Sequence, residues 1–180
     1  KAQTYSVCFS AATNYTVTSP WTICHNDFNN DGNEDLVVGA TNTTLDISVF
    51  LGNGTGTFAP PTTYTMSSDP YASCSADFNK DDKDDVGIWA GNSTQRTLYI
   101  LLGNGTGLAP PISAYTYTVS SGGAGSNATI CTDDFDNDSV PDIALICPST
   151  TTLRILLGNG SGGFVLASST ALSQSASSIT

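Results

Sequence analysis

Short runs of aliphatic, β-branched and aromatic residues alternate with turn residues along the whole chain. Runs of this kind, bounded by Gly, Pro, Asn, Asp or Ser and lacking a helical period, predict β-strands. Aliphatic runs occupy residues 36–38, 86–88 and 143–146, and each follows directly on an acidic stretch. The pattern therefore predicts an all-β protein.

The same succession of elements occurs three times. A short strand is expected over residues 21–24, 71–75 and 129–132, then an acidic loop, the aliphatic strand, and a third strand over residues 45–51, 98–102 and 153–157. The third strand ends at a glycine motif (residues 51–56, 102–107 and 157–162), in which Asn-Gly favours a hairpin turn. A fourth strand includes residues 62–66 and 114–119. Repeated four-stranded units of this size are typical of propeller blades.

The acidic loops cover residues 27–35, 77–85 and 134–142. Each has oxygen-bearing side chains at its first, third and fifth positions and a carboxylate at its ninth. Alternate residues of a tight loop can aim three oxygens at one point, and the carbonyl of position seven and the ninth carboxylate can complete the shell. Calcium takes about 6–8 oxygen ligands, so the sequence predicts about three calcium ions.

The charge supports this interpretation. The chain has 16 acidic and 5 basic residues and a net charge of −11, and only Asp46, Asp69 and Asp133 among the acids lie outside the loops. Crowded carboxylates repel one another, so the folded state is expected to require cations there. The same acidity argues against a nucleic-acid partner, which would need a basic patch.

The composition favours a secreted protein. Charged residues make up only 12% of the chain, and Ser, Thr, Asn and Gly are abundant. No apolar stretch approaches the roughly 20 residues of a membrane span, so no membrane span is expected. The sequence begins at Lys1 and shows no signal peptide, as expected of a mature chain or of an excised fragment. We expect an extracellular or cell-surface location.

The paired motifs D-F-[ND]-x-D-x-x-x-D and L-G-N-G-[TS]-G, present three times over roughly residues 20–166, resemble the FG-GAP/VCBS repeat. That repeat builds the N-terminal β-propeller of integrin α subunits and occurs in many secreted proteins. The resemblance implies a calcium ion between the first two strands of each blade. The implied ligands are Asp27, Asn29, Asp31, Asn33 (carbonyl) and Asp35; Asp77, Asn79, Asp81, Lys83 (carbonyl) and Asp85; and Asp134, Asp136, Asp138, Val140 (carbonyl) and Asp142. Of the sixth-position glycines only Gly32 is present, because Asp82 and Ser139 replace the others.

The fold prediction is therefore a β-propeller-type array of three four-stranded blades with partial blades at both ends. We expect one domain over residues 1–180, with a partial preceding blade in 1–19, blades in 20–69, 70–126 and 127–172, and the start of a next blade, or a donated strand, in 173–180. Residues 5–9 and 14–18 resemble the third and fourth strands of a blade, and residues 177–180 resemble a first strand.

Three arrangements of these ends remain open. Terminal strands can pair with another copy of the chain and give a filament or a closed oligomer. The chain can instead close on itself as a monomer, or be cut from a longer propeller. Copies of the chain itself are the expected partners under the first arrangement.

Two kinds of modification are expected. Equal spacing suggests disulfides between Cys8 and Cys24 and between Cys131 and Cys147, although small buried positions are an alternative use and sequence does not fix connectivity. N-glycosylation sequons occur at Asn14, Asn42, Asn92 and Asn127, and at Asn53, Asn104 and Asn159, where turn chemistry is the alternative role. A further sequon, at Asn137, lies between two implied ligands.

Nothing in the sequence suggests catalysis. His25 is the only histidine, no G-x-S-x-G motif exists, and the G-x-G-x-x-G match at residues 158–163 lacks a following helix. We expect a non-enzymatic, calcium-stabilised structural or adhesive module, glycosylated and assembling head to tail through its terminal strands. The alternatives are a lectin-like module that binds extracellular glycans or proteins, and a non-catalytic domain of a larger secreted protein.

Overall fold

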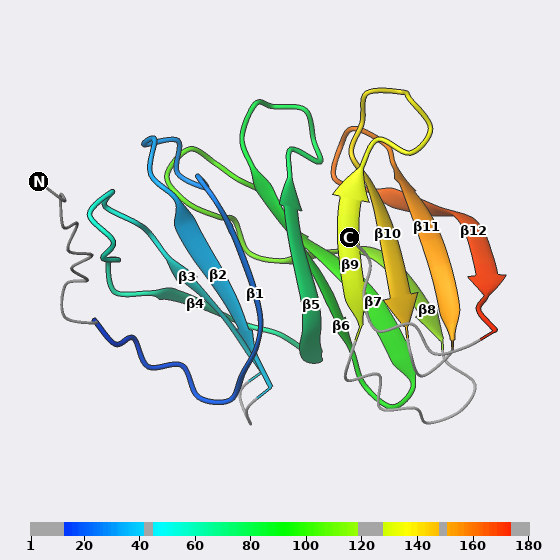
Figure 1. Ribbon diagram of the computed structural model, residues 1–180, viewed down its shortest axis with the longest axis horizontal. Helices are drawn as coiled ribbons and strands as arrows, with labels where there is room; N and C mark the ends of the chain where they lie inside the picture. The colour runs from blue at the N-terminus through cyan, green and yellow to red at the C-terminus, as the bar shows by residue number, and fades with distance from the viewer. Residues whose placement is uncertain (1–12, 42–44, 119–127, 148–150, 174–180) are drawn as a thin grey trace, which may run out of the picture.

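The computed structural model describes residues 13–41, 45–118, 128–147 and 151–173, which form three four-stranded antiparallel sheets without a helix (Figure 1). The first sheet contains β1 (Pro20–Asn26), β2 (Asp35–Ala40), β3 (Asp46–Phe50) and β4 (Thr62–Thr65). The second contains β5 (Asp69–Ala76), β6 (Asp85–Gly91), β7 (Gln95–Leu101) and β8 (Ile112–Thr118). The third contains β9 (Thr129–Asp133), β10 (Asp142–Cys147), β11 (Thr152–Gly158) and β12 (Phe164–Ala171).

Each sheet uses consecutive strands in chain order, as the repeated pattern predicts. The first strands β1, β5 and β9 lie next to one another, and the sheets fan out from them face to face (Figure 1). The prediction of an all-β array of three four-stranded units is confirmed. The described sheets do not close into a ring.

Two apolar cores hold the array together, one at each contact between sheets. Between the first and second sheets, Phe28, Val37 and Ile47 pack with Val86 and Leu101. Between the second and third sheets, the core contains Phe78, Trp89, Leu98, Ile143 and Leu145. Side chains alternate between the two faces of a strand, so one face of a sheet faces its predecessor and the other its successor.

The chain before β1 is not the strand expected over residues 14–18, because residues 13–19 are irregular. Its side chains anchor it instead. The ring of Tyr15 meets Phe50 and Phe58 edge to face, with centroids 5.8 and 5.6 Å apart, and its hydroxyl accepts a hydrogen bond from the Phe58 amide at 2.8 Å. The expected strands over residues 5–9 and 177–180 lie outside the described residues.

The predicted disulfide between Cys131 and Cys147 is wrong, because both carry free thiols. Strand register explains the difference. Cys131 on β9 pairs with Ala144 on β10, three residues before Cys147. Three residues place a strand position about 10 Å away and on the opposite face of the sheet, whereas a disulfide needs Cα atoms about 4.4–6.8 Å apart. Cys24 is also a free thiol, and its expected partner Cys8 lies outside the described residues.

Candidate metal centres

The three acidic loops occupy the same place in their sheets. Each joins the first strand to the second, between β1 and β2, β5 and β6, and β9 and β10, and all three lie at one end of the array, at the top of Figure 1. The repeat of the sequence is thus a repeat in space.

The aspartate at the first position closes each loop. The two oxygens of Asp27 accept hydrogen bonds from the amides of Asp31 and Gly32, at 3.0 and 2.7 Å. Asp77 and Asp134 make the same pair of bonds, at 3.1 and 2.9 Å and at 3.1 and 2.8 Å. The first carboxylate therefore faces the inside of the turn.

The side chains at the third and fifth positions of each loop also point towards the inside of that loop. Asn29 Oδ1 accepts from the Asp31 amide at 3.0 Å, and Asp31 Oδ1 accepts from the Asn33 amide at 2.8 Å. The second and third loops repeat both bonds. In the third loop, carboxylate oxygens of Asp134, Asp136 and Asp138 all lie within 4.8 Å of one another. A compact group of hard oxygen donors fits a calcium-type cation.

The backbone of the loops needs left-handed residues at two positions. At the fourth position Asn30, Lys80 and Asn137 have φ of 58°, 60° and 62°. At the sixth, Gly32, Asp82 and Ser139 have φ of 84°, 61° and 67°. Asp82 and Ser139 thus adopt the conformation of the glycine that they replace, at a cost of about 1–2 kcal/mol for an L-residue. The missing glycines do not change the loop.

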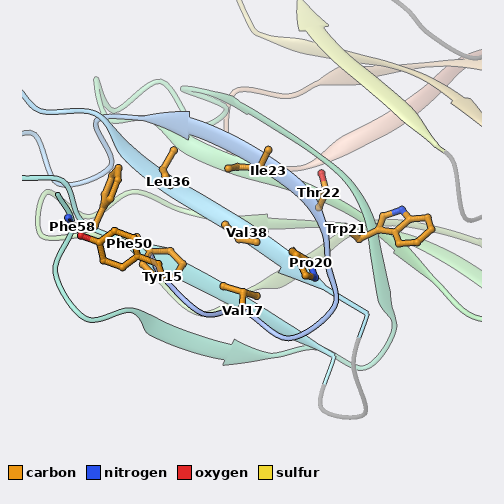
Figure 2. Close-up of a pocket in the computed structure, with 10 residues that line it drawn as sticks. All are labelled: Tyr15, Val17, Pro20, Trp21, Thr22, Ile23, Leu36, Val38, Phe50 and Phe58. Atoms are coloured by element: carbon orange, nitrogen blue, oxygen red, sulfur yellow. Dashed lines mark hydrogen bonds between the residues drawn. The ribbon is translucent and has the colours of Figure 1, made fainter. Parts of the chain in front are cut away.

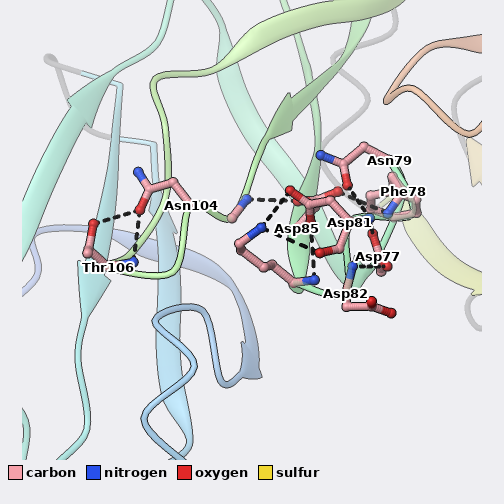
Figure 3. Close-up of polar contacts among 10 residues, drawn as sticks. Asp77, Phe78, Asn79, Asp81, Asp82, Asp85, Asn104 and Thr106 are labelled. Atoms are coloured by element: carbon pink, nitrogen blue, oxygen red, sulfur yellow. Dashed lines mark hydrogen bonds and ion pairs between the residues drawn. The ribbon is translucent and has the colours of Figure 1, made fainter.

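The ninth position has a role that sequence reasoning missed. Asp35, Asp85 and Asp142 are fully buried. The two oxygens of Asp85 accept hydrogen bonds from the amides of Phe78 and Gly103, at 2.9 and 2.7 Å (Figure 3). Equivalent bonds connect Asp35 to Phe28 and Gly52, and Asp142 to Phe135 and Gly158.

The ninth carboxylate therefore joins the acidic loop to the first glycine of the glycine motif. An ionised carboxylate has about four lone-pair sites, so two backbone hydrogen bonds leave room for a metal. The steady spacing of the two motifs along the sequence was the signal for this contact.

The first glycine of each glycine motif is required by close packing. A Cβ atom at Gly52 would lie 2.1 Å from the Glu34 carbonyl oxygen. At Gly103 and Gly158 it would lie 2.4 Å from the carbonyl oxygens of Asp84 and Pro141. The backbone of the third strand thus reaches the end of the acidic loop only where no side chain intervenes.

Burial and crowding disfavour bare carboxylates in the loops. Burial raises the pKa of Asp85 to about 6 and also raises the pKa of Asp35. The pKa of Asp136 is raised by desolvation and then by its carboxylate neighbours, first Asp138. A bound cation would offset both effects.

The second loop contains a positively charged side chain, that of Lys83. Lys83 Nζ lies 2.9 Å from Asp81 Oδ2, and this hydrogen bond holds the pKa of Asp81 below its usual range. The exposed Asp31 has no lysine; its pKa is lowered by hydrogen bonds, the largest effect coming from the Asn33 amide. The side chain of Lys83 therefore competes for an oxygen that calcium would use.

The sequons that the structure describes are exposed, and most take part in turns. Asn53, Asn104 and Asn159 each accept a hydrogen bond on Oδ1 from the amide two residues later, at 3.0, 2.9 and 2.9 Å. Asn92 does the same at 2.9 Å, whereas Asn14 is exposed on the irregular segment before β1. Asn42 and Asn127 lie outside the described residues.

A comparison with solved structures supports the fold. The chain is similar to the crystal structure of "BBS1N in complex with ARL6DN, soaked with lead", with a TM-score of 0.54 and 14% identity. The similarity covers 91% of this chain and 46% of that one, so the chain spans about half the length of its structural relative. At this identity the likeness concerns the fold alone.

Of two sequence comparisons, only the one with family models gives a match. No curated protein matches the chain. No helix in the described part of the chain is long and apolar enough to cross a membrane. The model of the family described as "FG-GAP-like repeat" matches residues 27–88, which include the first two acidic loops and the glycine motif between them. Residues 27–88 therefore match an FG-GAP-like repeat, and the three sheets of the chain are arranged as in a β-propeller.

Proposed function

We propose that the chain is a non-catalytic, calcium-stabilised propeller module that binds about three calcium ions. The observation that carries this proposal is the threefold recurrence of one loop geometry, in which the first, third and fifth side chains turn inward. FG-GAP repeats often bind calcium. Three loops of the same form argue for a shared ligand rather than for chance clustering of acids.

Calcium would act on the stability of each sheet. The first, third and fifth side chains, the carbonyl of position seven and the ninth carboxylate would hold the ion. Its charge would offset the repulsion among carboxylates, and the bound loop would tie the first strand of the sheet to the second. A ligand that binds only the folded state adds about 2.7 kcal/mol per site at 100-fold excess over Kd.

Thermal unfolding with and without calcium tests this proposal. We expect the melting temperature to fall sharply in excess EGTA and to recover when calcium is restored, and we expect calorimetric titration to give about three sites. Asp31→Ala should remove one site, whereas Asp46→Ala, outside the loops, should remove none. An unchanged melt in EGTA would contradict the proposal.

An extracellular location is part of the proposal. FG-GAP repeats occur in extracellular proteins, where calcium is plentiful enough to saturate sites of modest affinity. Asn14 and Asn92 are exposed and accessible to a glycosyltransferase. Intact-mass analysis of secreted material should exceed the 18.6 kDa of the bare chain; a mass equal to the polypeptide would count against glycosylation.

A structural or adhesive role for the module is favoured over a lectin-like, sugar-binding role. Trp89 is fully buried and Tyr71 is nearly so, and both pack between the second and third sheets. Of the two tryptophans only Trp21 is exposed. A sugar-binding face built from stacked aromatic rings would therefore have few members, and a glycan array without saturable binding is the expected result.

A further inference from the structure

The first sheet has an open apolar face. The face that is turned away from the second sheet contains a groove of about 350 Å³ (Figure 2). Its lining includes Ile23, Leu36, Val38, Phe50 and Phe58, and the ring of Tyr15 covers one end. Ile23 remains 61% exposed. Apolar surface of this extent often marks an interaction site.

The groove lies on the face of the first sheet that corresponds to a buried face in the other two sheets. Leu36 on β2 pairs with Phe50 on β3, and Val38 lies two residues after Leu36 on the same face; the later sheets have counterpart residues at the same three positions. Those counterparts are fully buried: Val86, Ile88 and Leu101 in the second sheet, and Ile143, Leu145 and Leu156 in the third. In each later sheet the preceding sheet covers these residues. The groove is therefore a surface made to receive a preceding sheet.

The third sheet exposes only part of the matching surface, because Ala144 and Ile146 on that face of β10 are buried. Phe28 and Phe78, at the second position of their loops, are fully buried against the following sheet, and the rings of Phe78 and Phe164 lie 5.4 Å apart. Phe135, the third member, is 42% exposed. Ile155 on the same face is half-buried, whereas its counterpart Ile100 is fully buried. No described sheet follows to cover them.

We infer that the Phe135 face of one copy docks into the Ile23 groove of a second copy, head to tail. Both halves of the interface belong to this chain, which already forms the same interface twice between its own sheets. No charged residue lines the groove, so the occupant must be apolar. The contact joins different surfaces of the two copies, and two copies would bring together six sheets, within the range of about 4–8 blades in propellers.

This inference names the partner of the proposed calcium-stabilised module and rests on it. The two are tested by different measurements, because the calcium role is measured by unfolding in EGTA and the docking by association of the folded chain in calcium. An unchanged melt in EGTA would therefore leave the docking result interpretable.

Sedimentation velocity of the full 180-residue chain in calcium, over a wide range of protein concentration, tests the docking. We expect species heavier than the 18.6-kDa monomer. Ile23→Asp and Phe135→Asp each introduce a charge into one half of the interface and should weaken association at least about tenfold. Ile112→Asp is the matched control, because Ile112 is 48% exposed on β8 of the middle sheet. It should associate like the wild type.

Mixing the two variants provides a second test. Ile23→Asp keeps an intact Phe135 face and Phe135→Asp keeps an intact groove, so an equimolar mixture should form a one-to-one dimer that neither variant forms alone. Circular dichroism melts would show that both variants are folded. A monomeric wild type at all concentrations, or association lost in only one variant, or no dimer in the mixture, would overturn the inference.

Discussion

The backbone amide of Gly103 donates a 2.7 Å hydrogen bond to the buried carboxylate of Asp85, and this bond joins residues 18 positions apart. The same bond occurs between Asp35 and Gly52 and between Asp142 and Gly158. The acidic loop and the glycine motif are thus two parts of one structural unit. The ninth aspartate serves the fold even before any metal is considered.

Replacement of Asp85 should therefore destabilise the protein with or without calcium. Asp85→Ala leaves the amides of Phe78 and Gly103 without their partner in a buried site, which should cost about 1–3 kcal/mol for each unsatisfied group. Asp81→Ala, at a position that contributes only to the loop, should lower stability mainly in calcium. Urea unfolding in calcium and in EGTA separates the two variants, because only Asp85→Ala should be destabilised in EGTA as well. An equal loss of stability for both variants in EGTA would contradict this division of roles.

Two glycines of one motif should respond differently to substitution. Gly103→Ala places a Cβ 2.4 Å from the Asp84 carbonyl oxygen, and overpacking of this kind typically costs about 1–3 kcal/mol. Gly105 has φ of 76° and no atom closer than 3.7 Å to its added Cβ. Gly105→Asn should be nearly neutral because asparagine tolerates a left-handed backbone. Thermal melts of the two variants would show the contrast, and similar losses would argue against the steric explanation.

Removal of the Lys83 amine should strengthen calcium binding at the second loop. Its Nζ lies 2.9 Å from Asp81 Oδ2, on an oxygen that the metal would use. Because surface ion pairs are weak, the gain for Lys83→Met should be only a few-fold in Kd. Calorimetry in a background with Asp31→Ala and Asp138→Ala isolates this site. A weaker affinity would show that the amine assists the loop rather than competes with the ion.

The metal-free protein should become more stable as the pH falls from about 7 towards 4. Burial raises the pKa of Asp85 from 3.8 to about 6, so the folded state binds a proton in this interval that the unfolded state does not. Protonation therefore favours folding there, and the benefit is lost as pH rises through 6. Calcium affinity should fall in the same interval, because binding needs the ionised carboxylate.

Unfolding of metal-stripped protein in urea at several pH values measures this effect. Asp85→Asn, which cannot titrate, should flatten the dependence between pH 4 and 6. A metal-free wild type that loses stability on acidification across this interval would contradict the assignment.

Much of the fold was readable from the sequence because it depends on local chemistry. The strands follow from runs of β-branched and aromatic residues, and the turns follow from Asn-Gly pairs with φ above zero at Gly54, Gly105 and Gly160. The spacing of oxygen donors in each loop depends only on neighbouring residues, so the loops and their inward-facing side chains could be predicted before the structure. Three repeats made each of these signals stronger than a single copy.

The remaining features depend on residues that meet from distant parts of the chain. The register of β9 on β10 decides that Cys131 and Cys147 lie on opposite faces, although their spacing suggested a bridge. The bond from Gly103 to Asp85 requires the third strand to return to the loop. The three loop phenylalanines hold equivalent sequence positions, yet the packing of sheets leaves only Phe135 of them exposed. Sequence determined the repeating unit through local conformational preferences, and tertiary structure alone decided which faces of that unit remain open, because burial depends on what lies on the other side.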